Sequence, residues 1–250
     1  RDLPRYSVLR EAGYRYVITH SPDERGINVA LLYQRGIFKL LSNRSYPVMK
    51  PRRNSRPTRD ILHVSGQLLN SDTLDVFVVH FPSRSGGAKA SEPYRLAAAQ
   101  RLKDTTDSLL RIRTRPQIII MGDFNDYPDN KSIRKILKAG IPPTETDSLD
   151  SRMLYHLLAR KGIDNKHFGS YKYQGECGLL DHIILSGSLL MPGSPLYTAE
   201  EKADVFRAPF LLTEDRKYGD EQPFRTYYGM KYQGGYSDHL PVWAEFRLLY

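Results

Sequence analysis

The chain has 250 residues, 40% of them hydrophobic and 26% charged, so it can bury a core without disulfide or metal support. Its single cysteine, Cys177, excludes an internal disulfide framework and any cysteine-rich zinc or iron–sulfur site. The formal net charge of +9 favours polyanionic partners such as nucleic acid, phosphorylated small molecules or an acidic membrane face, although a merely soluble basic protein has the same balance. No apolar run approaches the roughly 18 residues that a membrane-spanning helix needs, so we expect no membrane span.

The first half of the chain predicts two pairs of strands. Residues 27–33 and 37–48 are apolar and β-branched enough to pair around the turn at 34–36. Residues 60–69 and 73–80 form a second such pair around a short polar turn.

A strand–helix–strand crossover is expected next. Residues 76–79 and 118–121 are continuously apolar, which is typical of central strands covered on both faces. Between them, residues 92–111 carry an apolar stripe at helical spacing, with Ser91 as the N-cap and Pro93 in the first turn. This order indicates a βαβ unit.

The second half of the chain is less regular. Short helices are expected at residues 131–139 and 151–160, each from leucines and isoleucines at helical spacing. Residues 189–224 are polar and contain several prolines, which indicates a long surface excursion. Residues 242–248 alternate apolar and polar side chains, which predicts a final strand with one buried face. Linkers rich in Gly or Ser are absent, which favours a single domain.

The sharpest motif is MGDFND at residues 121–126, where an apolar strand ends. In extended geometry the side chains of Asp123 and Asn125 point the same way. The carboxylate can accept a proton or contact a metal, and the amide can donate to a phosphate oxygen. A strand-terminating turn explains the same residues equally well.

Three further motifs put polar groups at expected strand ends. Asp238 and His239 combine a metal-ligating carboxylate with an acid or base, although this dipeptide is common by chance. His80 ends an apolar strand and leads into SRSGG, a composition that suits phosphate or simply a flexible loop. Asp181 enters an apolar strand, where an unpaired charge is costly, so it needs a partner unless that strand start is exposed to solvent.

In this order the motifs resemble the endonuclease/exonuclease/phosphatase superfamily, the DNase I-like metal-dependent phosphoesterases. The matching segments are HFPSR, GDFN, LDHIILS and SDHLP, and residues 21–33 resemble the family's Arg-Gly strand. Residues 56–62 and 80–87 resemble a bacterial branch of it. The resemblance runs from about Ala12 to the end of the chain and leaves out residues 189–224. It implies an α/β fold, a four-layered sandwich of two packed mixed β-sheets flanked by helices, with the active site on loops at one end.

The resemblance also implies roles for the motif residues. Asp238 matches the family's metal-binding carboxylate, and His239 the histidine that touches the scissile phosphate. Asp181 matches the carboxylate that orients this histidine, so we expect a hydrogen bond between the two side chains. Asp123 matches the acid/base that readies the attacking water, and Asn125 the amide that holds a phosphate oxygen.

The other implied contacts are with substrate and metal. His80 resembles the second histidine of the nuclease-like branches, and Arg25, Ser83, Arg84 and Tyr171 are expected to contact the substrate. The implied metal is Mg²⁺ or Mn²⁺, because the ligands are hard oxygens. Such an ion would neutralise charge on the transition state and the leaving oxygen.

One part of the family pattern is not found between Arg1 and Tyr250. The family has an N-terminal strand ending in Asn and a second ending in Glu, a principal metal ligand, and neither has a counterpart here. We therefore expect residues 1–250 to be a single endonuclease/exonuclease/phosphatase domain without its N-terminal part. A polypeptide truly beginning at Arg1 is expected to bind Mg²⁺ weakly, show little activity and associate through an uncovered strand edge. A longer native chain is expected to be an active monomer, secreted or periplasmic if a signal peptide was removed and cytoplasmic otherwise.

These observations favour a metal-dependent phosphodiesterase, an endonuclease-like enzyme. A run of basic residues could follow a nucleic-acid backbone or simply form a solvated hairpin. The run consists of Lys50, Arg52, Arg53, Arg56 and Arg59. A phosphatase or phosphodiesterase acting on inositol phosphates or lipid head groups is the alternative within the enzyme class. A catalytically impaired module that only binds phosphate is the alternative outside it.

Overall fold

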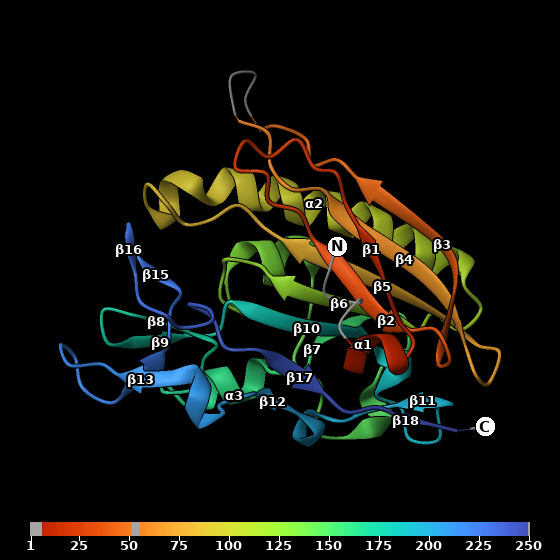
Figure 1. Cartoon of the computed structure of the whole chain (residues 1–250). Coiled ribbons are helices and arrows are strands. Elements are labelled where there is room, and N and C mark those ends of the chain that lie inside the picture. Colours follow the sequence, from red (N-terminus) through yellow and green to blue (C-terminus); the bar gives the residue numbers. More distant parts are fainter. Residues whose placement is uncertain (1–6, 52–55, 250) are drawn as a thin grey trace.

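The structure, a computed structural model, describes residues 7–51 and 56–249. Its centre is a mixed six-stranded sheet (Figure 1). The strands lie in the order β3 (Phe38–Tyr46), β4 (Ile61–Leu68), β5 (Thr73–His80), β6 (Ile118–Asp123), β10 (Asp181–Ser186) and β7 (Leu154–His156). The two continuously apolar segments become β5 and β6, which lie in the middle of the sheet as expected.

Helix α2 (Ala88–Ile112) connects β5 to β6, and the two strands are parallel, so the predicted βαβ crossover is confirmed. One face of the sheet packs against α2 and the short π-helix η2 (Ser132–Leu137). The buried side chains between these layers include Phe77, Leu102 and Ile133. The helix thus covers one face of the sheet and fixes the spacing of the two strands that end in His80 and Asp123.

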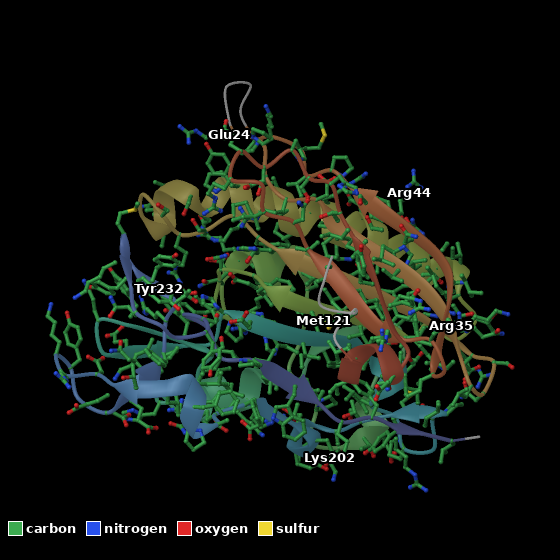
Figure 2. All side chains as sticks on the ribbon, viewed as in Figure 1. Glu24, Arg35, Arg44, Met121, Lys202 and Tyr232 are labelled. Atoms are coloured by element: carbon green, nitrogen blue, oxygen red, sulfur yellow. The ribbon has the colours of Figure 1, made fainter. Side chains whose placement is uncertain are left out.

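Short strand pairs cover the opposite face of the sheet. The inner side chains include Leu31, Val64 and Val205, and Met121 of β6 packs against them (Figure 2). The pairs are β1 (Tyr14–Ile18) with β2 (Ala30–Gln34), β12 (Ala203–Val205) with β17 (Val242–Ala244), and β11 (Leu196–Tyr197) with β18 (Arg247–Leu248). Two β-layers with an outer helix form the predicted α/β sandwich, and the fold class is confirmed.

The remaining elements are short. They are α1 (Ser7–Glu11), η3 (Thr146–Ser148), α3 (Ala159–Asp164), β8 (Tyr171–Tyr173), β9 (Glu176–Gly178), η4 (Gly187–Leu189), η5 (Glu200–Lys202), η6 (Pro209–Leu211), β13 (Leu212–Glu214), β14 (Glu221–Pro223), β15 (Tyr227–Tyr228) and β16 (Lys231–Tyr232). The strands β8, β9, β13, β14, β15 and β16 lie beyond the end of the central sheet at which β5 and β6 finish (Figure 1). Among the described residues, no helix has both the length and the apolar character needed to cross a membrane.

The predicted pairing of residues 27–33 with 37–48 is wrong. Strand β2 pairs with β1, whereas β3 pairs with β4 in the central sheet. The turn at 34–36 therefore carries the chain from one layer to the other, and the rings of Tyr33 and Phe38 meet edge-on at 5.6 Å across it. A pattern of two neighbouring strands cannot distinguish a hairpin from such a crossover between packed sheets.

Several local predictions also need correction. The expected helix at 151–160 is instead strand β7 followed by α3, because residues 154–158 are all buried and the tertiary environment overrides the helical spacing. Ser91 lies inside α2 and donates to the Gly87 carbonyl oxygen (2.8 Å), since the helix begins at Ala88. The helix expected at 131–139 is limited to the six residues of η2.

The end of the chain differs from its prediction too. The expected strand at 242–248 is split into β17 and β18, although its alternation of inner and outer side chains holds. Residues 189–205 contribute buried side chains to the core, including the fully buried Leu189 and Ala203, so this part of the predicted excursion is not a surface loop throughout.

A buried charge network anchors the end of the sheet opposite His80. Asp75 in β5 accepts hydrogen bonds from His63 (Nε2, 2.9 Å) and Arg113 (Nε, 2.8 Å). Burial alone would raise the pKa of Asp75, but the hydrogen bonds from His63 and Arg113 hold it below its ordinary value. A carboxyl with a lowered folded-state pKa stabilises the fold above its unfolded pKa of about 3.9, and this contribution is lost as the pH falls further.

We expect Asp75→Ala to lower the free energy of unfolding by about 3 kcal/mol at pH 7, because it leaves two polar partners uncompensated. The difference from the wild type should shrink in acid, where Asp75 is protonated. Urea unfolding at several pH values measures both effects. The control is Asp107→Ala, which breaks a half-exposed helical pair with Lys103 worth about 0.5 kcal/mol. Equal losses in the two variants would contradict the assigned role of Asp75.

Candidate active site

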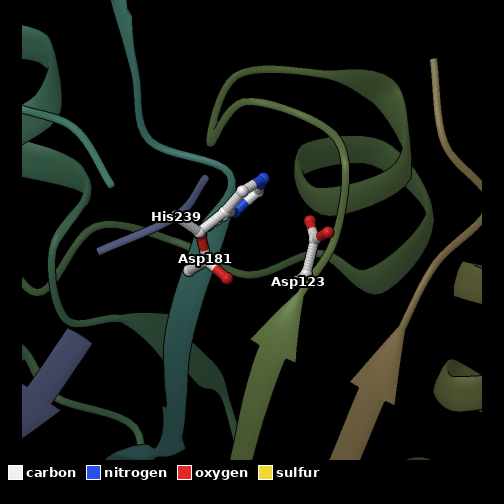
Figure 3. A group of neighbouring side chains, drawn as sticks. All are labelled: Asp123, Asp181 and His239. Atoms are coloured by element: carbon white, nitrogen blue, oxygen red, sulfur yellow. Dashed lines mark hydrogen bonds and ion pairs between the residues drawn. The ribbon is translucent and has the colours of Figure 1, made fainter. Parts of the chain in front are cut away.

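Three polar side chains come together where strands of the central sheet end or begin. In the parallel pair β5–β6, His80 lies opposite Asp123, and in the antiparallel pair β6–β10, Asp181 lies opposite Asp123. Figure 3 shows Asp123 at the tip of β6, with Asp181 on the neighbouring strand. Residues far apart in sequence thus form one row across the sheet edge, as expected from their places at strand ends.

His239 completes this group from the loop before β17. A single β-bridge to Tyr171 fixes its backbone, and its imidazole points toward Asp123 (Figure 3). The Nδ1 atom lies 2.6 Å from Oδ2 of Asp181, which also accepts a hydrogen bond of 2.6 Å from the Ser170 hydroxyl. The expected hydrogen bond between Asp181 and His239 is therefore present.

The Asp181–His239 pair favours the protonated, charged form of the imidazole. Burial by itself would lower the pKa of His239, but the hydrogen bond and the negative charge of Asp181 outweigh it and raise the pKa to about 9. Burial likewise tends to raise the pKa of Asp181, whereas the hydrogen bond from His239 lowers it below its ordinary value. At neutral pH the site therefore presents an imidazolium whose other nitrogen, Nε2, can donate a proton or a hydrogen bond.

The pKa of Asp123 is shifted in the opposite direction to that of Asp181. Burial, reinforced by the nearby charge of Asp181, raises the pKa of Asp123 to about 6. The left-handed backbone of Asn125 (φ 50°) turns its amide back toward this carboxylate. Asn125 Nδ2 donates to Asp123 Oδ2 (2.9 Å) and to the Phe81 carbonyl oxygen (3.0 Å). Both N–H groups of the amide are thus used within the protein, so Asn125 positions Asp123 here, and its expected contact with a phosphate oxygen stays a prediction.

The glycine of the GDFN motif has a local cause. Gly122 has a φ of 134°, and a Cβ there would lie 2.0 Å from the Val79 carbonyl oxygen of β5. Only glycine lets β6 approach β5 this closely one residue before Asp123.

We expect Gly122→Ala to lower the free energy of unfolding by about 2 kcal/mol or more and to displace Asp123, because the backbone must shift. Urea unfolding measures the loss. Gly36→Ala is the control, since a Cβ at Gly36 meets no atom within 4 Å. A fully stable Gly122→Ala protein would show that this close approach is not required.

Arg59 is a structural residue that the sequence did not reveal. Its side chain is only 4% exposed, and it donates to the Phe81 carbonyl oxygen (Nη2, 2.7 Å), the His80 carbonyl oxygen and Asp23. It therefore cannot follow a nucleic-acid backbone as part of the basic run. Lys50 and Arg56 lie on the surface. Arg52 and Arg53 lie outside the described residues.

His80 stays neutral beside this arginine. Burial, followed by the positive charge of Arg59, lowers the pKa of His80 to about 4. Its Nε2 lies 3.5 Å from Oδ2 of Asp123. His80 and His239 thus flank Asp123 as one neutral and one charged imidazole.

Most of the predicted site residues line a single depression of about 420 Å³. Asp238 lies on it with an exposed side chain, and Arg25 and Ser83 contribute from two other loops. Its other lining residues are His80, Asp123, Asn125, Asp181 and His239. Arg84 and Tyr171 line an adjoining depression that shares Ser83, Asn125, Asp238 and His239 with the first.

The ligand atoms of Asp123, Asp181 and His239 lie within 4.8 Å of one another, a spacing at which three groups could share one metal ion. Asp181 is engaged by Ser170 and His239, and a protonated imidazole does not coordinate a cation. The exposed carboxylate of Asp238, which lines the same depression as Asp123, is the better donor. Carboxylate oxygens fit a hard cation such as Mg²⁺ or Mn²⁺.

Comparison with known proteins gives a consistent result. A model of the Endonuclease/Exonuclease/phosphatase family matches residues 1–247. No curated protein sequence matches significantly. The structure is similar to the human Nocturnin catalytic domain with bound sulfate (TM-score 0.60, 16% identity, covering 98% of this chain and 76% of that one). It is also similar to a mannosyl-6-phosphatase of Bacteroides thetaiotaomicron (TM-score 0.59, 16% identity, covering 98% of this chain and 82% of that one). A third similar structure is a humanized D. rerio TDP2 (TM-score 0.57, 14% identity, covering 97% of this chain and 80% of that one).

At these identities the solved structures show the fold alone. The family model, by contrast, spans almost the whole chain, including all four motifs at the sheet edge. The chain therefore belongs to the endonuclease/exonuclease/phosphatase family.

Proposed function

We propose that this phosphoesterase-family protein is a Mg²⁺-dependent phosphodiesterase of the endonuclease type. One observation supports this proposal most: the charged imidazole of His239 and the carboxyl of Asp123, whose pKa is raised, line the same depression. A phosphodiester hydrolase needs a base for the attacking water and a cation near the phosphate oxygens, and this pair supplies both.

In this proposal each residue has a defined task. Asp123 accepts the proton of the attacking water, and Asn125 keeps its carboxylate oriented. The imidazolium of His239, held by Asp181, donates a hydrogen bond from Nε2 to a phosphate oxygen as negative charge grows there. Asp238 would hold the metal ion, which when bound supplies charge neutralisation on the phosphate. His80, Arg25 and Ser83 line the same depression and would contact the substrate.

The substrate is the open part of the proposal. A nucleic acid is favoured by the +9 charge, and the adjoining depression of about 680 Å³ leaves room for more than a phosphate. A phosphatase acting on inositol phosphates, sugar phosphates or lipid head groups would use the same residues, and one similar structure is named a mannosyl-6-phosphatase.

A substrate panel tests the proposal. The full-length protein is incubated with DNA, RNA, an inositol phosphate, a sugar phosphate and a phospholipid, each with Mg²⁺, with Mn²⁺ and with EDTA. We expect metal-dependent cleavage of a nucleic acid that stops in EDTA. Release of inorganic phosphate from the small substrates alone would favour the phosphatase. No turnover of any substrate would indicate a phosphate-binding module and would contradict catalysis.

A further inference from the structure

A third depression continues the active site toward the far end of the molecule. The depression beside the catalytic residues is lined by Tyr171 and Tyr173. Tyr173 also lines a depression of about 380 Å³ formed by residues 172–174, 214–218, 222, 225 and 228. The three hollows therefore follow one another from Asp123 to Tyr228. Figure 1 shows β8, β15 and β16 beyond the carboxyl ends of β5 and β6.

Aromatic rings and cationic groups alternate along this third depression. We call Tyr173, Tyr218 and Tyr228, with Lys217 and Arg225, the tyrosine surface. The three side chains Tyr173, Tyr218 and Tyr228 are 59%, 46% and 71% exposed. The Lys217 ammonium lies 4.9 Å from the Tyr218 ring centre, and the Arg225 guanidinium lies between the rings of Tyr171 (5.6 Å) and Tyr228 (6.0 Å).

The charge of this depression remains positive after internal pairing. Lys172 and Asp215 are both buried and neutralise each other at 3.1 Å. Glu214 pairs with Arg216 at 3.4 Å on the exposed rim. Among the described residues, no acidic side chain lies within 4.0 Å of the Lys217 or Arg225 cation. These two positive charges therefore remain available to a chain of phosphates.

Hydrogen bonds and packing contacts support the segments that carry Tyr218, Arg225 and Tyr228. Backbone hydrogen bonds join Gln233 to Thr226 (2.8 Å) and Gly235 to Arg225 (3.1 Å), and they extend the β15–β16 hairpin toward its base. Tyr218 packs on Gly175 in the turn between β8 and β9. Exposed rings held in place lose little entropy when they bind a ligand.

We propose that the tyrosine surface binds a single-stranded nucleic acid that extends out of the active site. This rests on the proposed function, since the strand would be the substrate. Bases of a single strand stack on exposed tyrosines regardless of sequence, while its phosphates meet interleaved Lys and Arg side chains. In a duplex the base faces are stacked on one another and are not available to Tyr228.

Binding in EDTA tests this without turnover. Fluorescence anisotropy compares labelled oligothymidylates of about 4 and about 12 nucleotides with a duplex of the longer length. The affinity for the longer single strand should be about tenfold higher than that for the shorter one. Tyr228→Ala should weaken the longer strand by roughly tenfold, while Tyr228→Phe keeps the ring and should change little. Lys217→Ala should reduce the slope of log affinity against log salt by about 0.7.

The matched control is Tyr232→Ala, which removes a ring of similar exposure (64%) from the same hairpin (Figure 2) but outside the depression. It should bind like the wild type, and all variants should hydrolyse bis(p-nitrophenyl) phosphate at the wild-type rate. Tighter binding of the duplex, no dependence on strand length, or equal loss in Tyr228→Ala and Tyr232→Ala would overturn the inference. Failure of the wild type to hydrolyse the small ester would instead contradict the proposed function.

Discussion

His239→Ala should lower turnover of a confirmed substrate by about 10²- to 10³-fold, as losing one preorganised donor to a developing charge does. His239 is held as a cation by Asp181 and points into the depression that contains Asp123. Its side chain is 21% exposed and packs on the Tyr171 ring (4.8 Å between ring centres) outside the two hydrophobic clusters, and Ser170 still donates to Asp181 in the variant. The variant also loses the Asp181–His239 pair, so its melting temperature should fall by several degrees, equivalent to about 2 kcal/mol, while the protein stays folded at the assay temperature.

Steady-state kinetics and thermal unfolding of the same preparation separate the two effects. His167→Ala removes an exposed histidine elsewhere and should leave both unchanged. If His239→Ala keeps wild-type turnover, the histidine has no part in the reaction. If turnover falls only together with a large loss of stability, its role is structural.

Asp181→Asn should abolish most of the charge on His239 at neutral pH. The pKa of His239 is about 9 because the Asp181 carboxylate outweighs the opposing effect of burial. Replacing the carboxylate by a neutral amide leaves the charges of Asp123 and Asp238 as the remaining effects against burial, so the pKa of His239 should fall toward the ordinary 6.5. With a neutral imidazole facing the phosphate, turnover at pH 7 should fall by about 10²-fold or more.

An NMR titration of the imidazole in metal-free protein measures the shift directly. Asp238→Asn is the comparison, because it removes an adjacent carboxylate that makes no hydrogen bond to His239 among the described contacts. We expect a much smaller shift there. An unchanged pKa of His239 in Asp181→Asn would show that the hydrogen bond at 2.6 Å does not set its charge.

Patterns inside single segments predicted much of the central sheet. The apolar runs at 76–79 and 118–121, with the helical stripe between them, were sufficient for the β5–α2–β6 crossover. Strand predictions were wrong where the actual partner strand lies farther along the chain than the neighbouring segment. Residues 37–48 join β4 and not β2, and residues 154–156 form a strand because β10 lies beside them.

The site was easier to predict than its surroundings. Asp123 and Asp181 were expected to lie at strand ends, and polar residues at strand ends of one sheet edge meet in space. The expected partner of Asp181 came from the family resemblance, because no local pattern links two residues 58 positions apart. Arg59 looked like one more surface cation, since only its contacts with the Phe81 and His80 carbonyl oxygens reveal its burial.

The tyrosine surface gave no signal in the sequence at all. Tyr173 and Tyr228 belong to segments that appear as unrelated polar stretches, and only the folding of residues 206–236 beside β8 brings them into one depression. Exposed aromatic residues become informative once the structure shows that they are neighbours.

The most direct test of the account is a crystal structure of the full-length protein with Mn²⁺ and a nucleoside monophosphate. The anomalous signal of Mn²⁺ should lie in the depression beside Asp123 and Asp238, with a phosphate oxygen within hydrogen-bonding distance of His239 Nε2. A metal ion and phosphate bound together away from these residues would contradict the assignment of this sheet edge as the catalytic centre.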